Sequence, residues 1–323
     1  MLLAIMLSAC NLPAPSTNNP AQDSARGTPY VSAPPCDAPG TATPPVSPIA
    51  TPTLMLPCVP SFSHVYVIVM ENQSFDHIVG SASAPYINSL IARYGLAANY
   101  NGVAHPSQPN YLALFSGSTQ GNTDDFRHDY TATTIADQLE ARGKTWKVFA
   151  QNVPLNCYTD VLASGGEDGP GEYVRRHNPA ISFTGISGSP ARCANITDFT
   201  HFDPATADYA FIVPNTCNDM HDTICPGGLN NVANGDSFLK EFVPKILNSS
   251  AWDDRSALFI TWDEAIGIGN RVPTLVISNK VPQGFQSATE HDHYSLLRTI
   301  QDAWGLGCLA NTCTANNLAE FFR

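Results

Sequence analysis

Apolar residues along the chain fall into two kinds of run, and the two kinds alternate. Continuous apolar runs typical of buried strands occupy residues 64–70, 145–150, 209–213, 256–262 and 272–277. Apolar residues at helical spacing predict helices over residues 86–93, 109–116, 134–142, 236–247 and 293–304. Strands that alternate with helices in this way indicate an α/β protein with a mostly parallel sheet covered by helices.

Three of these predicted strands run directly into polar residues. The residues at the three strand ends are Glu71 and Asn72, Asp263 and Glu264, and the group Asn215, Asp219 and His221. In an open α/β sheet, ligands bind in the crevice beyond the carboxyl ends of the strands. The pattern therefore predicts one site that is assembled from distant parts of the chain.

The carboxylates at these positions favour a divalent metal ion. Taken alone, Glu71 reads equally as a solvent-exposed strand end, Asp263 as a helix cap and residues 215–222 as a polar surface loop. Their shared placement argues for a site, because an unpaired carboxylate at the end of a buried strand is costly. Oxygen donors together with histidine suit Mg²⁺, Ca²⁺, Mn²⁺ or iron, and the sequence leaves the choice among them open.

Ser107 is the candidate nucleophile. It stands just before a predicted helix whose early turn holds Pro109, where proline is tolerated. The free N–H groups of that turn favour an anion beside the serine, and a base or a metal would activate its hydroxyl. Ser107 reads equally as a simple helix cap. His177 and His293 are candidates for binding phosphate or acting as acids, although a histidine in a loop is commonly only a surface residue.

The acidic composition excludes several classes of function. The chain has 323 residues and a net charge of −12, and 14% of its residues are charged, compared with roughly 25% in an average soluble domain. The net charge argues against a nucleic-acid partner and against electrostatic adsorption to anionic lipid. No GxGxxG motif follows the first predicted strand, which argues against a dinucleotide-binding fold.

The first sixty residues are expected to lie outside the folded domain. Residues 1–10 form a short apolar run that ends in Leu-Ser-Ala-Cys10 and resembles the signal of a bacterial lipoprotein; an ordinary secretion signal is the alternative. Residues 11–60 hold 13 of the 26 prolines and predict an extended tether. We therefore expect an exported protein with its catalytic domain at 61–323, attached to a membrane only through a lipid on Cys10.

The cysteine count agrees with export. If Cys10 carries lipid, eight of the nine cysteines remain, an even number that suits an oxidising compartment. Proximity in the sequence predicts the pairs 36–58, 157–193, 217–225 and 308–313, although eight cysteines allow 105 pairings.

Six strings of the sequence, in the same order, resemble the bacterial and fungal phosphoesterase family. They are Val67-Ile-Val-Met-Glu-Asn-Gln-Ser-Phe-Asp76, His105-Pro-Ser-Gln-Pro-Asn-Tyr111, Arg176-His-Asn-Pro179, Pro214-Asn215 with Asn218-Asp-Met-His-Asp222, Ile260-Thr-Trp-Asp-Glu264 and His293-Tyr-Ser-Leu-Leu-Arg-Thr-Ile300. That family includes acid phosphatases and phosphoinositide phosphatases related to phospholipases C. The resemblance implies a three-layer α/β/α sandwich of the alkaline-phosphatase type.

The resemblance also implies a role for each site residue. Ser107 would take up the phosphoryl group and Asn110 would hydrogen-bond a phosphoryl oxygen. His105, His177 and His221 would surround the phosphate, with Asp219 beside them. The implied metal positions are Glu71, Asn72, Ser107, Asp263, Glu264 and His293. The stretch that follows Glu264 is shorter and less rich in glycine than the family pattern, which leaves the number of metal ions open.

The implied activity is that of a metal-dependent, acid-phosphatase-like phosphoric monoester hydrolase with a phospho-enzyme intermediate. Its substrate would be a phosphorylated small molecule or a phosphoinositide-like lipid, and we expect a monomer. The long insertions of the large phospholipases C are absent, which favours this activity over a phospholipase C-type diesterase. A phosphate-binding lipoprotein without catalysis is a further alternative. A protonated histidine that assists the leaving group would favour activity at mildly acidic pH.

Overall fold

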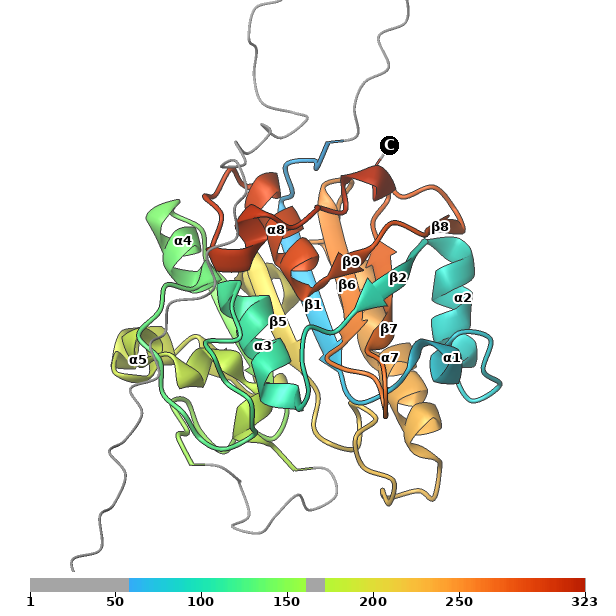
Figure 1. The fold of residues 1–323 in the computed structure, drawn as a ribbon, viewed down its shortest axis with the longest axis horizontal. Coiled ribbons are helices and arrows are strands. Elements are labelled where there is room, and N and C mark those ends of the chain that lie inside the picture. The colour runs from blue at the N-terminus through green and yellow to red at the C-terminus, as the bar shows by residue number, and fades with distance from the viewer. Residues whose placement is uncertain (1–57, 161–171, 323) are drawn as a thin grey trace, which may run out of the picture.

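The computed structural model describes residues 58–160 and 172–322 (Figure 1). The predicted signal sequence, Cys10 and nearly all of the predicted tether lie outside the described residues. The central sheet has nine strands. They are β1 His64–Met70, β2 Gly95–Asn101, β3 Trp146–Ala150, β4 Ile196–Thr197, β5 Tyr209–Val213, β6 Ser256–Trp262, β7 Arg271–Ile277, β8 Phe285–Ser287 and β9 His291–Asp292.

The sheet is mostly parallel, as the sequence predicts. The strands are ordered β4-β3-β5-β1-β6-β7-β2-β8, and β9 pairs with β2. Only β7 runs antiparallel to its neighbours β6 and β2 among the described strands. The expected α/β fold with a large central sheet is confirmed.

Helices cover both faces of the sheet. The α-helices are α1 Phe75–Ile78, α2 Pro85–Arg93, α3 Ser107–Ser116, α4 Ile135–Ala141, α5 Thr184–Ser187, α6 Pro190–Cys193, α7 Asn231–Leu247 and α8 His293–Ala303. The 3₁₀ helices are η1 Arg175–His177, η2 Pro179–Ser182, η3 Phe199–His201, η4 Pro204–Thr206, η5 Ala310–Cys313 and η6 Ala319–Phe321. Helices α3 and α8 pack together in front of the sheet in Figure 1, while α2 packs against α7.

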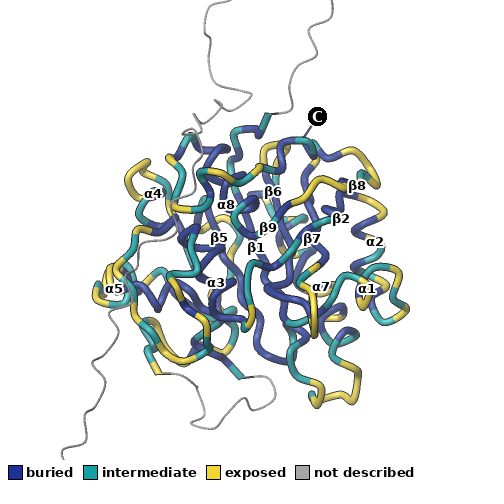
Figure 2. The backbone as a smooth tube through the Cα atoms, viewed as in Figure 1, coloured by how far each residue is buried: buried dark blue, intermediate teal, exposed yellow. Residues whose placement is uncertain are grey.

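Alternation along β1 decides which face receives each side chain. Met70 points toward α7, where a Cβ on Gly235 would lie 3.0 Å from its terminal methyl group. The next residue, Glu71, points to the opposite face and reaches α3. Residues 65–70 of β1 are buried, in keeping with the dark central strands of Figure 2.

The predicted boundaries hold best where the apolar pattern is strongest. Strands β1, β5 and β6 have the predicted limits. Helix α7 begins at Asn231, five residues before the predicted start, because the side chain of Asn230 accepts a hydrogen bond from the backbone N–H of Ala233 and caps it. Strand β2 is not predicted, because its sequence Gly-Leu-Ala-Ala-Asn-Tyr-Asn has no strand-like alternation.

Strands β5, β1 and β6 are adjacent and parallel, so their carboxyl ends meet at one edge of the sheet. The register places Met70 level with Trp262, and therefore Glu71 level with Asp263. The backbone N–H of Asp263 donates to Met70 O at 3.0 Å, and that of Glu71 donates to Asp219 O at 2.7 Å. The three polar groups predicted from separate parts of the sequence are thus joined by backbone hydrogen bonds.

Three of the predicted disulfides are present: Cys157–Cys193, Cys217–Cys225 and Cys308–Cys313. The fourth predicted pair, 36–58, involves Cys36, which lies outside the described residues. The disulfide Cys217–Cys225 closes the loop that carries Asp219 and His221. Between residues 58 and 322, leaving aside 161–171, no helix combines the length and apolar character that crossing a bilayer requires.

Asp236 on α7 connects this helix to the start of α2. Its buried carboxylate accepts the backbone N–H groups of Ile87 at 2.8 Å and Tyr86 at 3.2 Å, in the first turn of α2. We expect Asp236→Ala to lower the free energy of unfolding by about 2 kcal/mol, because it leaves two helix N–H groups without their acceptor. Urea denaturation measures this, with exposed Glu241→Ala on the same helix as the control. Equal stability of the two variants would contradict the assignment.

Candidate active site

Ser107 is the first residue of α3 and lies at the carboxyl edge of the sheet. The helix cap is Pro106, so the sequence alternative in which Ser107 only caps the helix is not what the structure shows. The preceding loop approaches β6 closely, since a Cβ on Gly102 would lie 2.6 Å from Asp263 O. Glycine at this position therefore lets the serine loop lie directly against the strand end.

The side chain of Asn110 holds the serine loop in shape. Its Oδ1 accepts the N–H groups of Val103 and Ala104 at 2.8 and 3.0 Å, and its Nδ2 donates to Ala104 O and Pro106 O at 2.9 and 3.2 Å. All of its hydrogen-bonding capacity is used by the backbone. In this structure Asn110 positions the serine loop, and its contact with a phosphoryl oxygen stays a prediction.

The hydroxyl of Ser107 lies between two carboxylates. Its Oγ is 3.1 Å from Glu71 Oε2 and 3.1 Å from Glu264 Oε1. The serine is 3% exposed, so these contacts are shielded from bulk water. Residues 36 and 157 positions away in the sequence thus converge on one oxygen atom, as the strand-end pattern predicts.

Glu71 is the most crowded carboxylate of the site. Tyr111 donates its hydroxyl to Oε1 at 2.5 Å, and Asn72 donates Nδ2 to Oε2 at 2.8 Å. The backbone of Asn72 has φ of 45°, a left-handed conformation that asparagine tolerates, and its N–H reaches Asp263 Oδ1 at 3.1 Å. This turn directs both residues of the predicted Glu-Asn pair toward the site.

His177 and Asp219 extend the site away from the serine. The ring of His177 stacks on Tyr111 with centroids 5.1 Å apart, and its Nε2 is 3.2 Å from Glu71 Oε1. Its Nδ1 is 3.4 Å from Asp219 Oδ2. Burial lowers the pKa of His177 well below its ordinary value, and the positive charge of Arg176 adds to this effect. The buried ring is therefore neutral at ordinary pH.

His293 supports Asp263 from behind. Its Nε2 is 2.6 Å from Asp263 O, and its Nδ1 is 3.1 Å from the hydroxyl of Tyr100. Burial lowers the pKa of His293 to about 4, so the ring is neutral and donates from Nε2 to the carbonyl. Both ring nitrogens are engaged, which makes His293 a positioning residue in this structure and leaves neither nitrogen open for the predicted metal contact.

His105 and His221 lie at the mouth of the site. His105 contacts Glu264 through Nδ1 and is 44% exposed in its side chain. His221 is 27% exposed, contacts Asp222 Oδ1 at 3.0 Å and packs near the ring of His177 with centroids 6.1 Å apart. These two are the histidines of the site that solvent reaches.

Burial raises the pKa of every carboxylate in the cluster. Desolvation is the main cause for Glu71, Asp219, Asp263 and Glu264, and mutual repulsion adds to it at Glu71 and Asp263. The pKa of Asp263 rises to about 8. Several negative charges in so little water demand a compensating positive charge.

The donor set fits a divalent cation. Asp263 Oδ2, Asp219 Oδ2 and His177 Nε2 are buried without a hydrogen-bond partner. Both ring nitrogens of His177 face carboxylate oxygens, but a neutral imidazole has only one N–H. The other nitrogen therefore presents its lone pair to a carboxylate oxygen that also carries lone pairs, which is unfavourable. Carboxylate oxygens with one imidazole are typical ligands of Mg²⁺, Mn²⁺ or iron. A second group of possible ligands, Cys217, Asp222 and Cys225, offers no thiolate because the cysteines form a disulfide.

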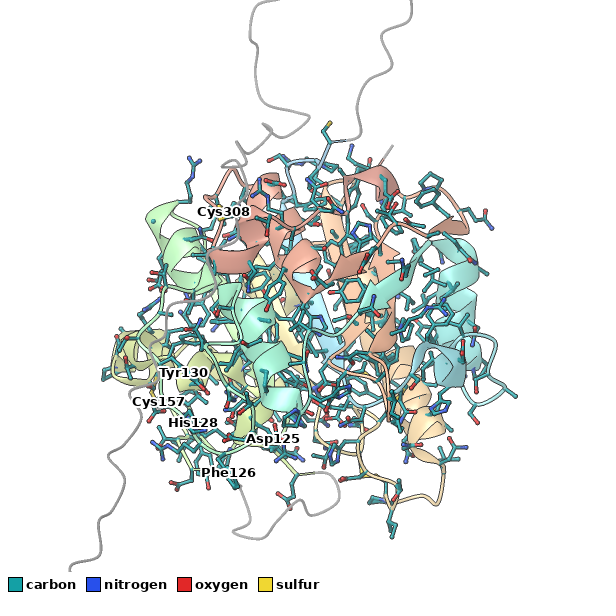
Figure 3. All side chains as sticks on the ribbon, viewed as in Figure 1. Asp125, Phe126, His128, Tyr130, Cys157 and Cys308 are labelled. Atoms are coloured by element: carbon teal, nitrogen blue, oxygen red, sulfur yellow. A yellow bond between two sulfur atoms is a disulfide. The ribbon has the colours of Figure 1, made fainter. Side chains whose placement is uncertain are left out.

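Two residues of the site were not singled out from the sequence. Tyr111 lies one helical turn after Ser107 on α3, a spacing that places both on one face. Arg176 precedes His177, and its positive charge lowers the pKa of Glu71 and Asp219, which places it near the carboxylates. The Arg176 side chain is 13% exposed, and its Nε is 3.8 Å from Asp125 Oδ2. Asp125 itself caps α3 by accepting Gln108 N at 2.9 Å, and Figure 3 shows it near the start of that helix.

Comparisons with known proteins identify the family and the fold. Residues 81–307 match the phosphoesterase family. The chain is 32% identical to the phosphatidylinositol-3-phosphatase of Mycobacterium tuberculosis over 77% of this chain and 79% of that protein. It is 28% identical to an acid phosphatase of Aspergillus fumigatus over 80% of this chain but only 58% of that protein. A solved structure of an alkaline phosphatase superfamily protein from Vibrio parahaemolyticus has the same fold, with a TM-score of 0.54, 12% identity, and coverage of 80% of this chain and 69% of that one.

The raised pKa of Asp263 predicts how stability depends on pH when metal is removed. A folded-state pKa of about 8, above the ordinary value of 3.8 for an aspartate, means that folding favours the protonated form. The stabilisation is complete below pH 4 and is lost as pH rises toward 8, by up to about 1.4 kcal/mol per pH unit. We therefore expect the Tm of the chelator-treated protein to fall across this range, and to fall less in Asp263→Asn.

The matched control is Asp254→Asn, which removes an exposed acidic charge from the surface. It should leave the pH dependence of Tm unchanged. If Tm changed with pH in the same way in the parent protein and in Asp263→Asn, folding would not raise the pKa of Asp263, and this prediction would be contradicted.

Proposed function

The chain belongs to the phosphoesterase family and is a phosphatase-type hydrolase, and from this premise we propose that it hydrolyses phosphoric monoesters through Ser107 with the help of a divalent metal ion. The observation that carries the proposal is the position of the Ser107 hydroxyl, 3.1 Å from the carboxylates of both Glu71 and Glu264 at the start of α3. A serine hydroxyl becomes a nucleophile when a base takes its proton or a bound metal lowers its pKa. In this proposal the carboxylates serve as the base and would also hold the metal.

In the first step, Ser107 Oγ forms a bond to phosphorus as the bond to the ester oxygen breaks. The proton of Ser107 passes to a neighbouring carboxylate, Glu264 or Glu71. Burial raises the pKa of both carboxyl groups, which makes them stronger bases than ordinary glutamates. In the second step, water attacks the phosphoserine, the Oγ–P bond breaks, and Ser107 recovers its proton as phosphate leaves.

The leaving alcohol needs a proton, and His221 is the candidate that fits best. His177 and His293 are buried, and burial keeps their pKa values too low for either to be protonated at mildly acidic pH. His221 lies at the mouth of the site, its side chain is 27% exposed, and its Nδ1 is 3.0 Å from Asp222 Oδ1. The preference for mildly acidic pH stays a prediction, and His221 is the residue that we propose protonates the leaving alcohol.

The residues that would hold the cation are the buried Glu71, Asp219, Asp263, Glu264 and His177. Three of them, Asp219, Asp263 and His177, carry a buried ligand atom without a hydrogen-bond partner. When bound, the ion would lower the pKa of the serine hydroxyl and neutralise charge on the phosphoryl group. Of the other predicted ligands, Asn72 donates its amide to Glu71 and His293 uses both ring nitrogens elsewhere. Arg176 would add a planar donor pair suited to phosphate oxygens.

The substrate is proposed from chemistry and from relatives. One relative is named a phosphatidylinositol-3-phosphatase and another an acid phosphatase. We propose a phosphorylated small molecule or a phosphoinositide-like lipid, and a monoester in preference to a diester. We also propose that the protein is exported by means of its N-terminal signal.

Replacing Ser107 tests the nucleophile. We expect Ser107→Ala to lower kcat for p-nitrophenyl phosphate at least 10³-fold while phosphate still binds, because only the attacking oxygen is lost. The control is Ser116→Ala at the other end of α3, whose hydroxyl donates to Leu112 O and lies away from the carboxylates. Turnover that persists in Ser107→Ala would mean that another group attacks phosphorus. Faster hydrolysis of bis-p-nitrophenyl phosphate than of the monoester would favour the phospholipase C-type alternative.

Removing metal tests the cofactor. After EDTA treatment and dialysis, we expect activity to fall by more than 100-fold and to return with one of Mg²⁺, Ca²⁺, Mn²⁺ or Fe²⁺. The same ion should raise Tm at pH 8, because it compensates the ionised carboxylates, and should do so less in Glu71→Gln. Elemental analysis of the purified protein identifies the ion. Full activity in metal-free protein would rule out the proposed cofactor.

A further inference from the structure

The large apolar side chains exposed in the described residues lie on one side of the molecule. They are Phe126, Leu155, Ile224, Leu229, Ile266 and Ile268, and we refer to them as the apolar rim. Exposure is greatest at Ile268, Ile224 and Phe126, at 108%, 79% and 75%. Single exposed apolar residues need no explanation, but their concentration around one feature does.

Five of the six rim residues lie on segments that leave the carboxyl edge of the sheet. Leu155 follows β3, Ile224 and Leu229 follow β5, and Ile266 and Ile268 follow β6. The segments after β5 and β6 also carry residues of the candidate active site. Within residues 58–160 and 172–322, the opposite edge of the sheet presents no exposed side chain of this kind.

Phe126 reaches the same edge by a different route. Its neighbour Asp125 accepts the N–H of Gln108, the residue that follows Ser107, so Phe126 is held beside the start of α3. Figure 3 shows Phe126 at the lower margin of the molecule, the edge at which β1, β5 and β6 end. The rim residues therefore lie on loops at the same edge of the sheet as Ser107.

The rim residues stand on loops that project from the body of the protein. Gly227 and Gly228 follow Ile224, and Gly267 and Gly269 flank Ile268; all four have positive φ. A Cβ at any of the four would meet no atom within 4 Å. The exposed loops at this edge appear in yellow in Figure 2. The apolar tips are thus raised above their surroundings rather than sunk in a continuous flat patch.

We propose that the apolar rim docks the active-site edge onto the neutral surface of a phospholipid bilayer. Separate apolar tips on protruding loops can each enter the headgroup region. Removing these side chains from water lowers the free energy of the bound state. A protein partner would instead require a continuous complementary surface. The loops also carry Asp124, Asp125 and Asp222, and the chain has a net charge of −12, so the matching surface is zwitterionic rather than anionic.

The proposal concerns docking and does not depend on the reaction at Ser107. It adds an interaction surface to the proposed function. The surface would serve a lipid substrate, but docking does not require one. A vesicle-binding assay therefore tests it separately from any measurement of turnover.

The test is sedimentation of the full chain with phosphatidylcholine vesicles, using Cys10→Ser throughout so that no N-terminal lipid contributes. We expect the parent protein to bind and the double variant Ile224→Ser with Ile268→Ser to partition at least tenfold more weakly. The matched double variant to leucine at the same positions should bind like the parent. Ser107→Ala should also bind like the parent, while the rim variants should hydrolyse soluble p-nitrophenyl phosphate at the parent rate.

Several results would overturn the proposal. Equal binding of the serine and leucine double variants would remove the role of the rim, and so would a parent protein that does not bind the vesicles. Binding that appears only when phosphatidylserine is added would contradict a neutral target. Dimers in sedimentation equilibrium that disappear in the serine double variant would assign the rim to a second copy of the chain.

Discussion

The structure depends on one electrostatic constraint: several carboxylates are buried together where apolar strands end. Glu71, Asp219 and Asp263 are fully buried, and Glu264 is 5% exposed. Every contact around them reduces the cost of this burial. The hydroxyls of Tyr111 and Ser107, the amide of Asn72 and the backbone N–H of His221 all donate to these oxygens. The remaining unpartnered oxygens mark where a positive charge is required.

This constraint also explains the division of roles among the histidines. The two buried rings are held neutral, one stacked on Tyr111 and one hydrogen-bonded to the Asp263 carbonyl. They shape the site without carrying charge. The two rings at the mouth, His105 and His221, are the ones that water and a substrate reach. Sequence alone could not separate the two pairs, because burial of a loop histidine is decided by the packing of other segments.

The fold was predictable where the local pattern of apolar residues alone determines the element. Strands β1, β5 and β6 are continuous apolar runs, and their polar successors could be placed together because parallel strands end at one edge. Strand β2 escaped prediction because its pairing with β7, and not its composition, makes it a strand. Asn110 and His293 could be placed in the site, but their contacts depend on the serine loop and on Tyr100. Those contacts arise only once the chain is folded.

The antiparallel course of β7 affects how such an enzyme can diversify. Because β7 returns beside β6, the segment between them leaves and re-enters the sheet at neighbouring positions. Asn270 fixes its far end: its Oδ1 accepts Ala265 N, its Nδ2 donates to Ala104 O, and its backbone carbonyl accepts Gly102 N. The segment 266–269 can therefore change in length or in residue type while the carboxylates at the end of β6 keep their positions. Natural selection can alter what approaches the serine at this hairpin without disturbing the chemistry beneath it.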